Sequence, residues 1–522
     1  MPLLLTALLA TLPIDDPPTA WPGFLGARAT EVRAAELPLA WTPESGAAWT
    51  ADLPGQGQSS PIIWGEQVYA TSIDGTMKDT CHVTAVDLAD GKVAWTWSTP
   101  SSQPVRSNYF QSRSAPTPVA DAEGVCAFFE TGDVVALDHQ GEEIWRRSLV
   151  EDYGEFESTI GLASSPLLVD GKLILLIDHE GPSYLLALDR ATGETAWMTE
   201  RDSRKSYSSP LLASIGGRIQ IVCSADGSVD GYDPADGRRL WTFDQVGGNT
   251  SCSPLSFGDG RLLIGASAGM HGEREADARK SNVVLAIDQI DGEFRPRIVW
   301  SADKAMPTFA SPMVHQGLAY WVNRVGVVFC FDAETGEPKY SERIAQSCWA
   351  TPIGIDDRIY FFGKDGVTSV IAAGPEFRLL SENTLWDPEK VEAEPLARRR
   401  AAGGGASTHN DGDHAEHRDG SGEAAGGQPE GAGRPEGAGR PEGSGRPGAA
   451  GRPEAAGRSD GTGAPPAGQA GAPSGRPAPG SQEEAAMREA MAGVFADPVQ
   501  YGVAIVPGSI VIRTGTKLHC LR

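Results

Sequence analysis

A small residue followed by proline, in most copies a serine or threonine, recurs along the chain, and each copy opens a short apolar segment. Successive copies are spaced by roughly forty to fifty-five residues, a period typical of arrays of small β units. The clear copies start at Ser60, Ser165, Ser209, Ser253, Ser311 and Thr351, and the weaker ones at Thr117 and Asp497. Because one such unit cannot bury its own apolar faces, we expect the units to pack against one another in a closed array.

A second motif follows most of these openings, and it consists of an aspartate, a glycine turn and an aromatic residue. In the third unit it runs from Asp189 through Gly193 to Trp197. The aspartate is expected to bind the amides of a hairpin turn, where the glycine adopts a positive φ. The aromatic residue then lies on the returning strand, and its ring packs between adjacent sheets. The aromatic residues are Trp95, Trp145, Trp197, Trp241, Trp300 and Tyr340. Several short strands per unit at this period predict an all-β propeller.

The two ends of the repeat region complete each other. Residues 47–53, which include Trp49, resemble the last strand of a unit whose earlier strands are missing. Residues 499–522 supply earlier strands but lack the tryptophan-bearing finish. An N-terminal strand that closes the last blade would place Trp49 near Val511 and remove both open sheet edges. We therefore predict eight blades, with seven as the alternative because the units near 252–300 and 340–390 diverge from the pattern.

Composition divides the chain further. Residues 1–20 contain an apolar core of about ten residues, too short to span a bilayer, and are predicted to be a signal peptide. This stretch has no Lys or Arg, so a misassigned start codon is the alternative. Residues 21–390 hold blades 1–7, and residues 486–522 hold the last blade. Residues 391–485 are rich in Gly, Pro, Arg and Glu and almost free of large apolar side chains. They are predicted to be a disordered insertion. Residues 481–495 contain helix-forming residues and are compatible with a short helix.

Charge and cysteine usage exclude several classes of partner and of metal or redox site. The net charge of -25 argues against nucleic acid and anionic lipid as partners. The seven cysteines show no paired spacing, which excludes zinc ribbons, thioredoxin chemistry and covalent c-type haem and predicts buried strand cysteines. No later stretch is apolar enough to cross a membrane. We expect an exported monomer of the periplasm, the cell envelope or the extracellular space.

Four sets of residues are candidates for a site. The tract from His409 to His417 combines three histidines with carboxylates, but in disordered sequence it would bind metal adventitiously or not at all. Asp178, His179, Ser183 and Arg201 include the residue types of a hydrolase, but they lack a nucleophile-elbow frame, so a hydrogen-bonded rim is preferred. The charged loop 270–280 is interpreted as a solvated excursion, with a partner-contacting loop as the alternative. Trp349, Trp321 and Tyr320 are interpreted as core residues rather than rim anchors.

Longer segments carry a family resemblance. They are residues 21–26, 128–138, 183–189 and 512–520, together with the two repeated motifs. The chain resembles the pyrroloquinoline-quinone-like repeat family of β-propellers, which includes the quinoprotein alcohol dehydrogenases and BamB, and within it a secreted bacterial subgroup. The resemblance implies that an enzyme of this family would hold its quinone against adjacent cysteines beside a calcium ion. No two cysteines are adjacent here, so we assign no catalytic, cofactor-binding or metal-binding residue and no cofactor.

Three functions remain open from the sequence. The preferred hypothesis is a non-catalytic propeller that binds another envelope protein or an extended polymer. The first alternative is a quinone- or metal-dependent oxidoreductase with an atypical site. The second is a protein that binds carbohydrate or a cell-surface polymer, with the insertion as a tether.

Overall fold

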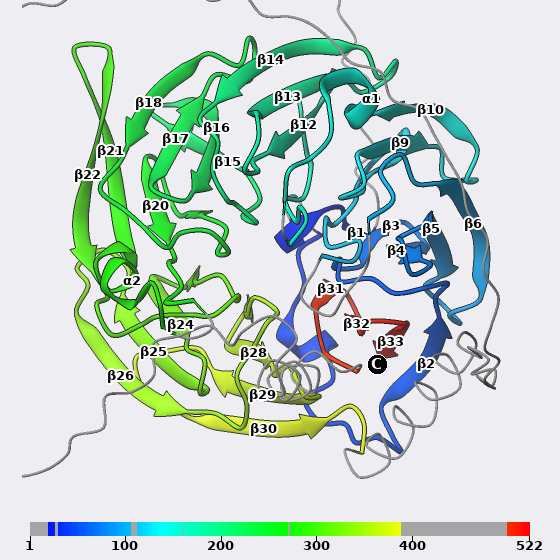
Figure 1. Cartoon of the computed structure of the whole chain (residues 1–522). Helices are drawn as coiled ribbons and strands as arrows, with labels where there is room; N and C mark the ends of the chain where they lie inside the picture. Colours follow the sequence, from blue (N-terminus) through cyan, green and yellow to red (C-terminus); the bar gives the residue numbers. More distant parts are fainter. Residues whose placement is uncertain (1–18, 27–29, 106–111, 159, 270–271, 388–497) are drawn as a thin grey trace, which may run out of the picture. The chain divides into compact units, whose positions relative to one another are not determined.

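A computed structural model describes residues 19–26, 30–105, 112–158, 160–269, 272–387 and 498–522. Most of the predicted signal peptide, the tract 409–417, the predicted insertion and the possible helix 481–495 lie outside these residues. Within them, eight antiparallel sheets are arranged around a common axis (Figure 1). The prediction of an eight-bladed propeller is therefore confirmed, and the alternative of seven blades is wrong.

The first four blades follow the chain in order. Blade 1 contains β1 (Ala20–Trp21), β3 (Ile62–Trp64), β4 (Gln67–Asp74), β5 (Thr80–Asp87) and β6 (Val93–Pro100). Blade 2 contains β7 (Val119–Asp121), β8 (Gly124–Phe128), β9 (Asp133–Leu137) and β10 (Glu143–Ser148). Blade 3 contains β11 (Leu167–Val169), β12 (Lys172–Ile177), β13 (Ser183–Asp189) and β14 (Thr195–Arg201). Blade 4 contains β15 (Leu211–Ile215), β16 (Arg218–Ala225), β17 (Ser228–Tyr232) and β18 (Arg239–Phe243).

The remaining blades complete the ring. Blade 5 contains β19 (Leu255–Ser256), β20 (Arg261–Ile264), β21 (Val283–Ile290) and β22 (Glu293–Ser301). Blade 6 contains β23 (Met313–His315), β24 (Leu318–Val322), β25 (Val327–Asp332) and β26 (Pro338–Arg343). Blade 7 contains β27 (Ile353–Ile355), β28 (Arg358–Phe362), β29 (Val367–Ala372) and β30 (Leu379–Thr384). Blade 8 contains β31 (Gly502–Val506), β32 (Ser509–Arg513), β33 (Lys517–Leu521) and β2 (Ala47–Asp52).

Strand β2 closes the ring, as the sequence predicts. It pairs antiparallel with β33, and Trp49 lies opposite Cys520, which in turn pairs with Val511. An ion pair between Lys517 and Asp52 adds a side-chain contact across the same two strands. The closure therefore joins β2 to the three strands that follow residue 498 through an antiparallel strand pairing.

The tryptophan motif joins neighbouring blades. The Trp49 ring lies against the turn glycine Gly91 of blade 1, where an added Cβ would sit 2.6 Å from the ring. Its Nε1 donates to the Leu88 carbonyl at 2.8 Å. The turn aspartate Asp87 accepts a hydrogen bond from the backbone of the same turn, and Gly91 has a φ of 74°. The same indole–turn hydrogen bond recurs at Trp95, Trp145, Trp197 and Trp300.

The second and third strands of each blade form the core. Strands such as β8, β9 and β17 are buried along their whole length, because neighbouring blades cover both of their faces. All seven cysteines are free and buried. Two of them, Cys252 and Cys348, lie in loops rather than in strands. Tyr320 and Trp321 are fully buried, which confirms the prediction that they belong to the core.

Antiparallel strands sort the connections onto two faces. One face of the propeller carries the connections that lead into the first strand of each blade and those between its second and third strands. We call it the loop face. The opposite face carries the tight turns between the other strands, and we call it the turn face. The short helices α1 (Leu149–Tyr153) and α2 (Glu275–Ser281) both belong to the loop face. Among the described residues, no helix combines the length and the hydropathy of a membrane span.

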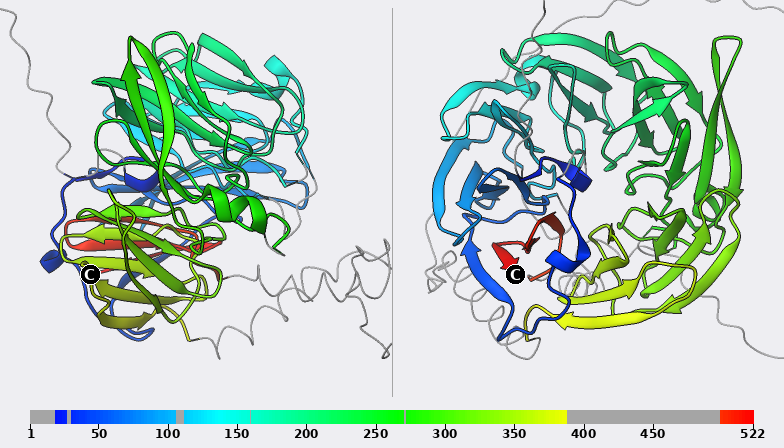
Figure 2. Two further views of the ribbon diagram at one scale, coloured as in Figure 1. Left: turned by 90° about the vertical axis from the view of Figure 1, so that its left-hand side faces the viewer. Right: turned by 180° about the vertical axis from the view of Figure 1, so that it is seen from behind.

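An N-terminal segment, residues 19–26 and 30–46, crosses the turn face (Figure 2, right). Strand β1 pairs with β3 on the inner side of blade 1. It is followed by the short helix η1 (Phe24–Gly26), and further on by η2 (Ala34–Glu36). The Ala34 amide then donates to Asp356 of blade 7 at 2.7 Å, before the chain enters β2. The sequence signals neither this fifth strand nor the path of the segment.

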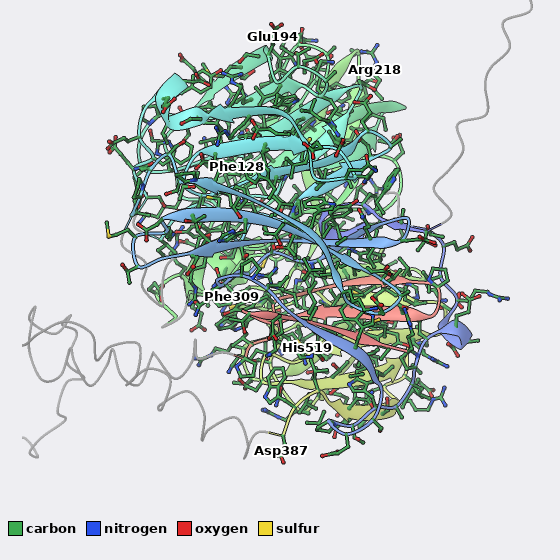
Figure 3. All side chains as sticks on the ribbon, turned by 90° about the vertical axis from the view of Figure 1, so that its right-hand side faces the viewer. Phe128, Glu194, Arg218, Phe309, Asp387 and His519 are labelled. Atoms are coloured by element: carbon green, nitrogen blue, oxygen red, sulfur yellow. The ribbon has the colours of Figure 1, made fainter. Side chains whose placement is uncertain are left out.

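The closing strands contain a group that is sensitive to pH. His519 of β33 lies beside β2, and its Nδ1 is 3.1 Å from the Thr50 hydroxyl (Figure 3). Burial, reinforced by the Lys517 ammonium and opposed by Asp52, lowers the pKa of His519 to about 4. The unfolded chain therefore binds a proton near its ordinary pKa of about 6.5, while the folded chain resists protonation.

We expect the contribution of His519 to the free energy of unfolding to be constant above pH 6.5 and to fall between about pH 6.5 and pH 4. The slope has an upper limit of about 1.4 kcal/mol per pH unit. Urea unfolding at several pH values measures this effect, and H519Q is expected to flatten the acid limb. An identical acid limb in H519Q and the original chain would contradict the assignment.

Candidate functional site

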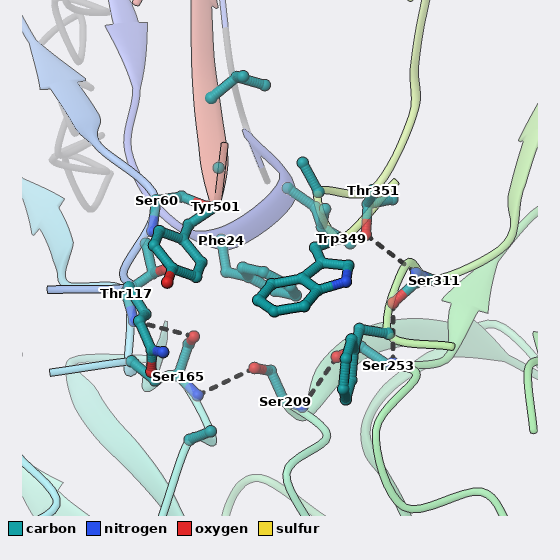
Figure 4. A pocket seen from close by; sticks show the side chains of 18 of the residues that line it. Phe24, Ser60, Thr117, Ser165, Ser209, Ser253, Ser311, Trp349, Thr351 and Tyr501 are labelled. Carbon is teal, nitrogen blue, oxygen red and sulfur yellow. Dashed lines mark hydrogen bonds between the residues drawn. The ribbon is translucent and has the colours of Figure 1, made fainter. Parts of the chain in front are cut away.

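A ring of hydroxyl groups surrounds the axis of the propeller. Each Ser–Pro or Thr–Pro motif places its hydroxyl toward the axis at the start of an innermost strand (Figure 4). The backbone N–H of each such residue donates to the hydroxyl of the next blade, at 2.9–3.1 Å over six consecutive junctions. We call this set the hydroxyl ring, and its members are Ser60, Thr117, Ser165, Ser209, Ser253, Ser311 and Thr351. The repeated motif therefore links the blades side by side.

Blade 8 interrupts the hydroxyl ring. When blade 8 is aligned with the other blades on its first hairpin turn, Gly502 occupies the position of the ring residue. Val503 then stands where the other blades have proline. Asp497, which is predicted to open the eighth unit with Pro498, lies outside the described residues, and Pro498 precedes β31 rather than occupying the ring position. A Cβ at Gly502 would collide with the Ser60 hydroxyl, so glycine allows blades 8 and 1 to approach closely.

One test addresses the ring directly. S209A removes the hydroxyl that accepts the Ser165 N–H at 2.9 Å and leaves that buried donor without its acceptor. We expect the free energy of unfolding to fall by about 1–3 kcal/mol, measured by urea titration. The matched control is S208A, because the buried Ser208 hydroxyl has no hydrogen-bond partner among the described residues. Equal losses in the two variants would contradict the role of the ring.

Aromatic side chains cover one side of the ring on the loop face. Phe309 and Trp349 contact edge to face, with ring centroids 5.2 Å apart. Trp349 and Tyr501 lie 6.0 Å apart, and Tyr207 lines the same space. Trp349 is half-buried and reaches toward the axis, so the prediction that it is a core residue is wrong. Its side chain faces the channel because it stands two residues before a ring hydroxyl, a signal that repeat alignment alone does not reveal.

Together these groups enclose a central pocket. Its volume is about 130 Å³. The N-terminal segment contributes Trp21, Phe24 and Leu25 to its wall, so the chain fills its own channel from the turn face. None of the residues that line the pocket carries a formal charge. The wall of the pocket therefore offers hydroxyl groups and apolar surface rather than charged side chains.

The predicted hydrolase-like set converges at the loop-face end of blade 3. Arg201 forms two hydrogen bonds with Asp178, at 2.8 and 3.1 Å, and also contacts Tyr232 of blade 4. Burial alone lowers the pKa of Arg201, but Asp178 and its other neighbours raise it well above the ordinary value. The guanidinium is therefore a permanent positive charge between two blades.

His179 and Ser183 do not form a nucleophile–base pair. The Ser183 hydroxyl donates to the His179 carbonyl at 3.0 Å rather than to its ring. The imidazole Nδ1 accepts the backbone amides of Gly181 and Glu157, at 3.0 and 3.2 Å. These contacts match the hydrogen-bonded rim that the sequence favours.

The turn aspartates and the histidine tract are the metal-binding candidates of the sequence. Among the described residues, no group of three or more His, Cys, Asp or Glu side chains is arranged to hold a metal ion. The turn aspartates bind backbone amides, as at Asp189 with Ala191 and Thr192. The histidine tract 409–417 lies outside the described residues.

The charged loop 270–280 is largely exposed in its described part and is anchored at two residues. Its described part enters α2, where Ala278 is buried. Arg274 pairs with Asp226 of blade 4, with Nη1 2.9 Å from Oδ2. Most of the described residues of the loop are exposed, as the interpretation as a solvated excursion expects, while Ala278 and Arg274 attach it to blades 4 and 5.

Comparisons with known proteins agree with this architecture. The family described as outer membrane protein assembly factor BamB matches residues 34–213, 181–295 and 280–431. BamB of Burkholderia pseudomallei is 27% identical over 207 residues, which are 39% of this chain and 49% of that protein. The match thus spans about half the length of that relative.

Two solved structures show weaker similarity. BamB from Moraxella catarrhalis has a TM-score of 0.44 at 17% identity and covers 64% of this chain and 86% of its own. A europium-containing methanol dehydrogenase has a TM-score of 0.39 at 12% identity and covers 69% of this chain and 90% of its own. The matches to the family model, by contrast, extend over most of the propeller. The chain belongs to the family of the outer membrane protein assembly factor BamB.

Proposed function

We propose that this protein is a non-catalytic scaffold of the cell envelope and that it binds another protein through its loop face. The family description names an assembly factor of the outer membrane, which supports a role in assembly rather than in catalysis. A propeller is a platform, so its function depends on the surface that it presents. The predicted signal peptide supports export to the compartment where such a partner would lie.

The difference between the two faces is the observation that carries the proposal. The turn face is built from tight turns, and the N-terminal segment of the same chain crosses it. The loop face holds connections of different lengths, including those that contain α1 and α2. Loops of variable length on a rigid scaffold are the usual carriers of recognition.

Exposed apolar side chains provide the test. Met77 and Val325 lie on the loop face and are 41% and 47% exposed. Ile219 and Ile290 lie beside turns of the turn face and are 53% and 44% exposed. The two pairs are thus matched in exposure and in character, and they differ in the face that they occupy.

The experiment compares two double variants of the full chain. M77E/V325E is expected to lose the partners that cross-link to the original chain in envelope extracts, while I219E/I290E keeps them. Both variants should retain the melting temperature, since surface substitutions usually change stability by less than about 0.5 kcal/mol. Loss of partners in the turn-face variant alone would overturn the assignment of the face.

The two alternatives from the sequence have their own readouts. Saturable alcohol oxidation after incubation with quinone and calcium would replace the scaffold with an oxidoreductase. Binding of the chain to a glycan array, without any protein partner in the cross-linking experiment, would favour the binding of a surface polymer.

Deletion of residues 391–485 tests the insertion. Loss of every partner in that deletion would move the function from the propeller to the insertion.

A further inference from the structure

We propose that the central pocket binds a small, uncharged molecule that combines one flat apolar ring with an oxygen that accepts hydrogen bonds. This inference goes beyond the scaffold function and does not depend on it. It rests on the direction of the ring hydroxyls, the absence of charge in the wall and the distribution of bulk around the axis.

The hydroxyl ring offers hydrogen-bond donors to the pocket. Six of its hydroxyls accept a backbone N–H from the preceding blade, and this bond uses an oxygen lone pair. The proton of each hydroxyl remains available, because a serine or threonine hydroxyl is one donor as well as an acceptor. Among the described residues, no hydrogen bond from a ring hydroxyl to a protein acceptor is formed. The oxygens converge on the pocket (Figure 4), so an occupant with an acceptor oxygen satisfies donors that are otherwise unused.

Ser60 is the clearest of these donors. Its own N–H donates to Thr117, but its hydroxyl makes no hydrogen bond within the described residues. The preceding ring position, in blade 8, is occupied by Gly502. Both Ser60 and Gly502 line the pocket. The gap in the ring therefore coincides with the hydroxyl that is most available to a ligand.

The residues that line the pocket disfavour a charged ligand. Its residues carry no formal charge, and a charged group in a desolvated site needs a counter-charge or a full set of hydrogen bonds. Uncharged O–H donors favour a carbonyl or ether oxygen, which gains a hydrogen bond without the desolvation cost of a carboxylate. An uncharged ligand is thus the better fit.

Large and small side chains are distributed unevenly around the propeller axis. Two residues before the ring hydroxyl, blades 6 and 7 carry Phe309 and Trp349, whereas blades 2 and 3 carry Ala115 and Ala163. The alanines leave space opposite the aromatic wall, and the faces of that wall favour a flat partner. An apolar cavity of about 150 Å³ can hold benzene, so a pocket of this size accepts one ring.

The test uses three probes on the full chain. Acetophenone has the ring and the carbonyl, ethylbenzene has the same shape without the acceptor, and benzoate adds a charge. Binding is followed by the change in tryptophan fluorescence and by saturation-transfer NMR. We expect saturable binding of acetophenone, with ethylbenzene and benzoate each weaker by about tenfold or more.

Variants locate the binding. S60A removes a donor that holds no protein contact through its hydroxyl, and it is expected to weaken acetophenone by about three- to tenfold. A163F fills the space opposite Trp349 and is expected to abolish binding. The matched control is S341A, on the exposed outer strand β26, which should leave the affinity unchanged.

Two outcomes overturn the proposal. One is the absence of saturable acetophenone binding to the original chain. The other is equal binding of acetophenone to the original chain, S60A and a folded A163F, which would place the probe elsewhere. Should A163F fail to fold, the ratio of acetophenone to ethylbenzene affinity in S60A still decides. Loss of the Ser60 donor is expected to make the affinities for the two probes more nearly equal. Neither outcome bears on the cross-linking experiment, so failure here leaves the scaffold proposal intact.

Discussion

Replacement of Trp49 by alanine is expected to lower the free energy of unfolding by about 3–5 kcal/mol and to produce concentration-dependent oligomers. Trp49 is buried, packs against Gly91 of blade 1 and donates to the Leu88 carbonyl. Its strand is also the closing strand of blade 8. Loss of the ring therefore loosens β2, and the freed edge of β33 becomes available to another chain.

W95A is the matched control for this effect. Trp95 makes the same contact with the turn of blade 2, where its Nε1 donates to the His139 carbonyl at 3.0 Å. Its strand β6, however, is continuous with the rest of blade 1. We expect W95A to lose stability in urea titration without forming oligomers in analytical ultracentrifugation. Oligomers in both variants, or in neither, would contradict the role of β2 as the closure.

Replacement of Arg201 by methionine is expected to be as costly, at about 3–5 kcal/mol. The guanidinium and its partner Asp178 are both almost completely buried, and Asp230 is also within reach at 3.5 Å. The variant leaves the Asp178 carboxylate inside the protein without its hydrogen-bonding cation. Urea unfolding measures the loss directly.

Two comparisons separate burial from charge. R201M/D178L is expected to be more stable than R201M alone, because the second substitution removes the stranded carboxylate. R147M breaks the more exposed pair of Arg147 with Asp152 and should cost about 1 kcal/mol or less. A double variant less stable than R201M would show that packing, rather than the uncompensated charge, determines the loss.

Much of the architecture could be predicted because it depends on local chemistry that repeats. An aspartate that binds turn amides, a glycine with positive φ and a tryptophan on the returning strand identify each blade without knowledge of its neighbours. Closure by the strand around Trp49 followed from two incomplete units at the ends. The disordered character of residues 391–485 and the signal peptide stay predictions from composition.

The parts that were missed depend on contacts between distant residues. Strand β1 has only two residues, and nothing in its sequence specifies its pairing with β3. Gly502 has no serine or proline to mark it, because its function is the close approach of Ser60. Trp349 has the hydrophobicity of a core residue, and only the geometry of the ring places it in the channel. The pocket is therefore a property of the closed propeller rather than of any one repeat.

The pairing of β2 with β33 also has a consequence for biosynthesis. The ion-paired residues of the two strands, Asp52 and Lys517, are separated by 465 positions. During translation, β2 leaves the ribosome long before its partner, so the circle cannot be sealed until β33 has emerged. The nascent chain must keep two adhesive strand edges apart from other molecules throughout that interval, which makes it a natural client for a holding chaperone.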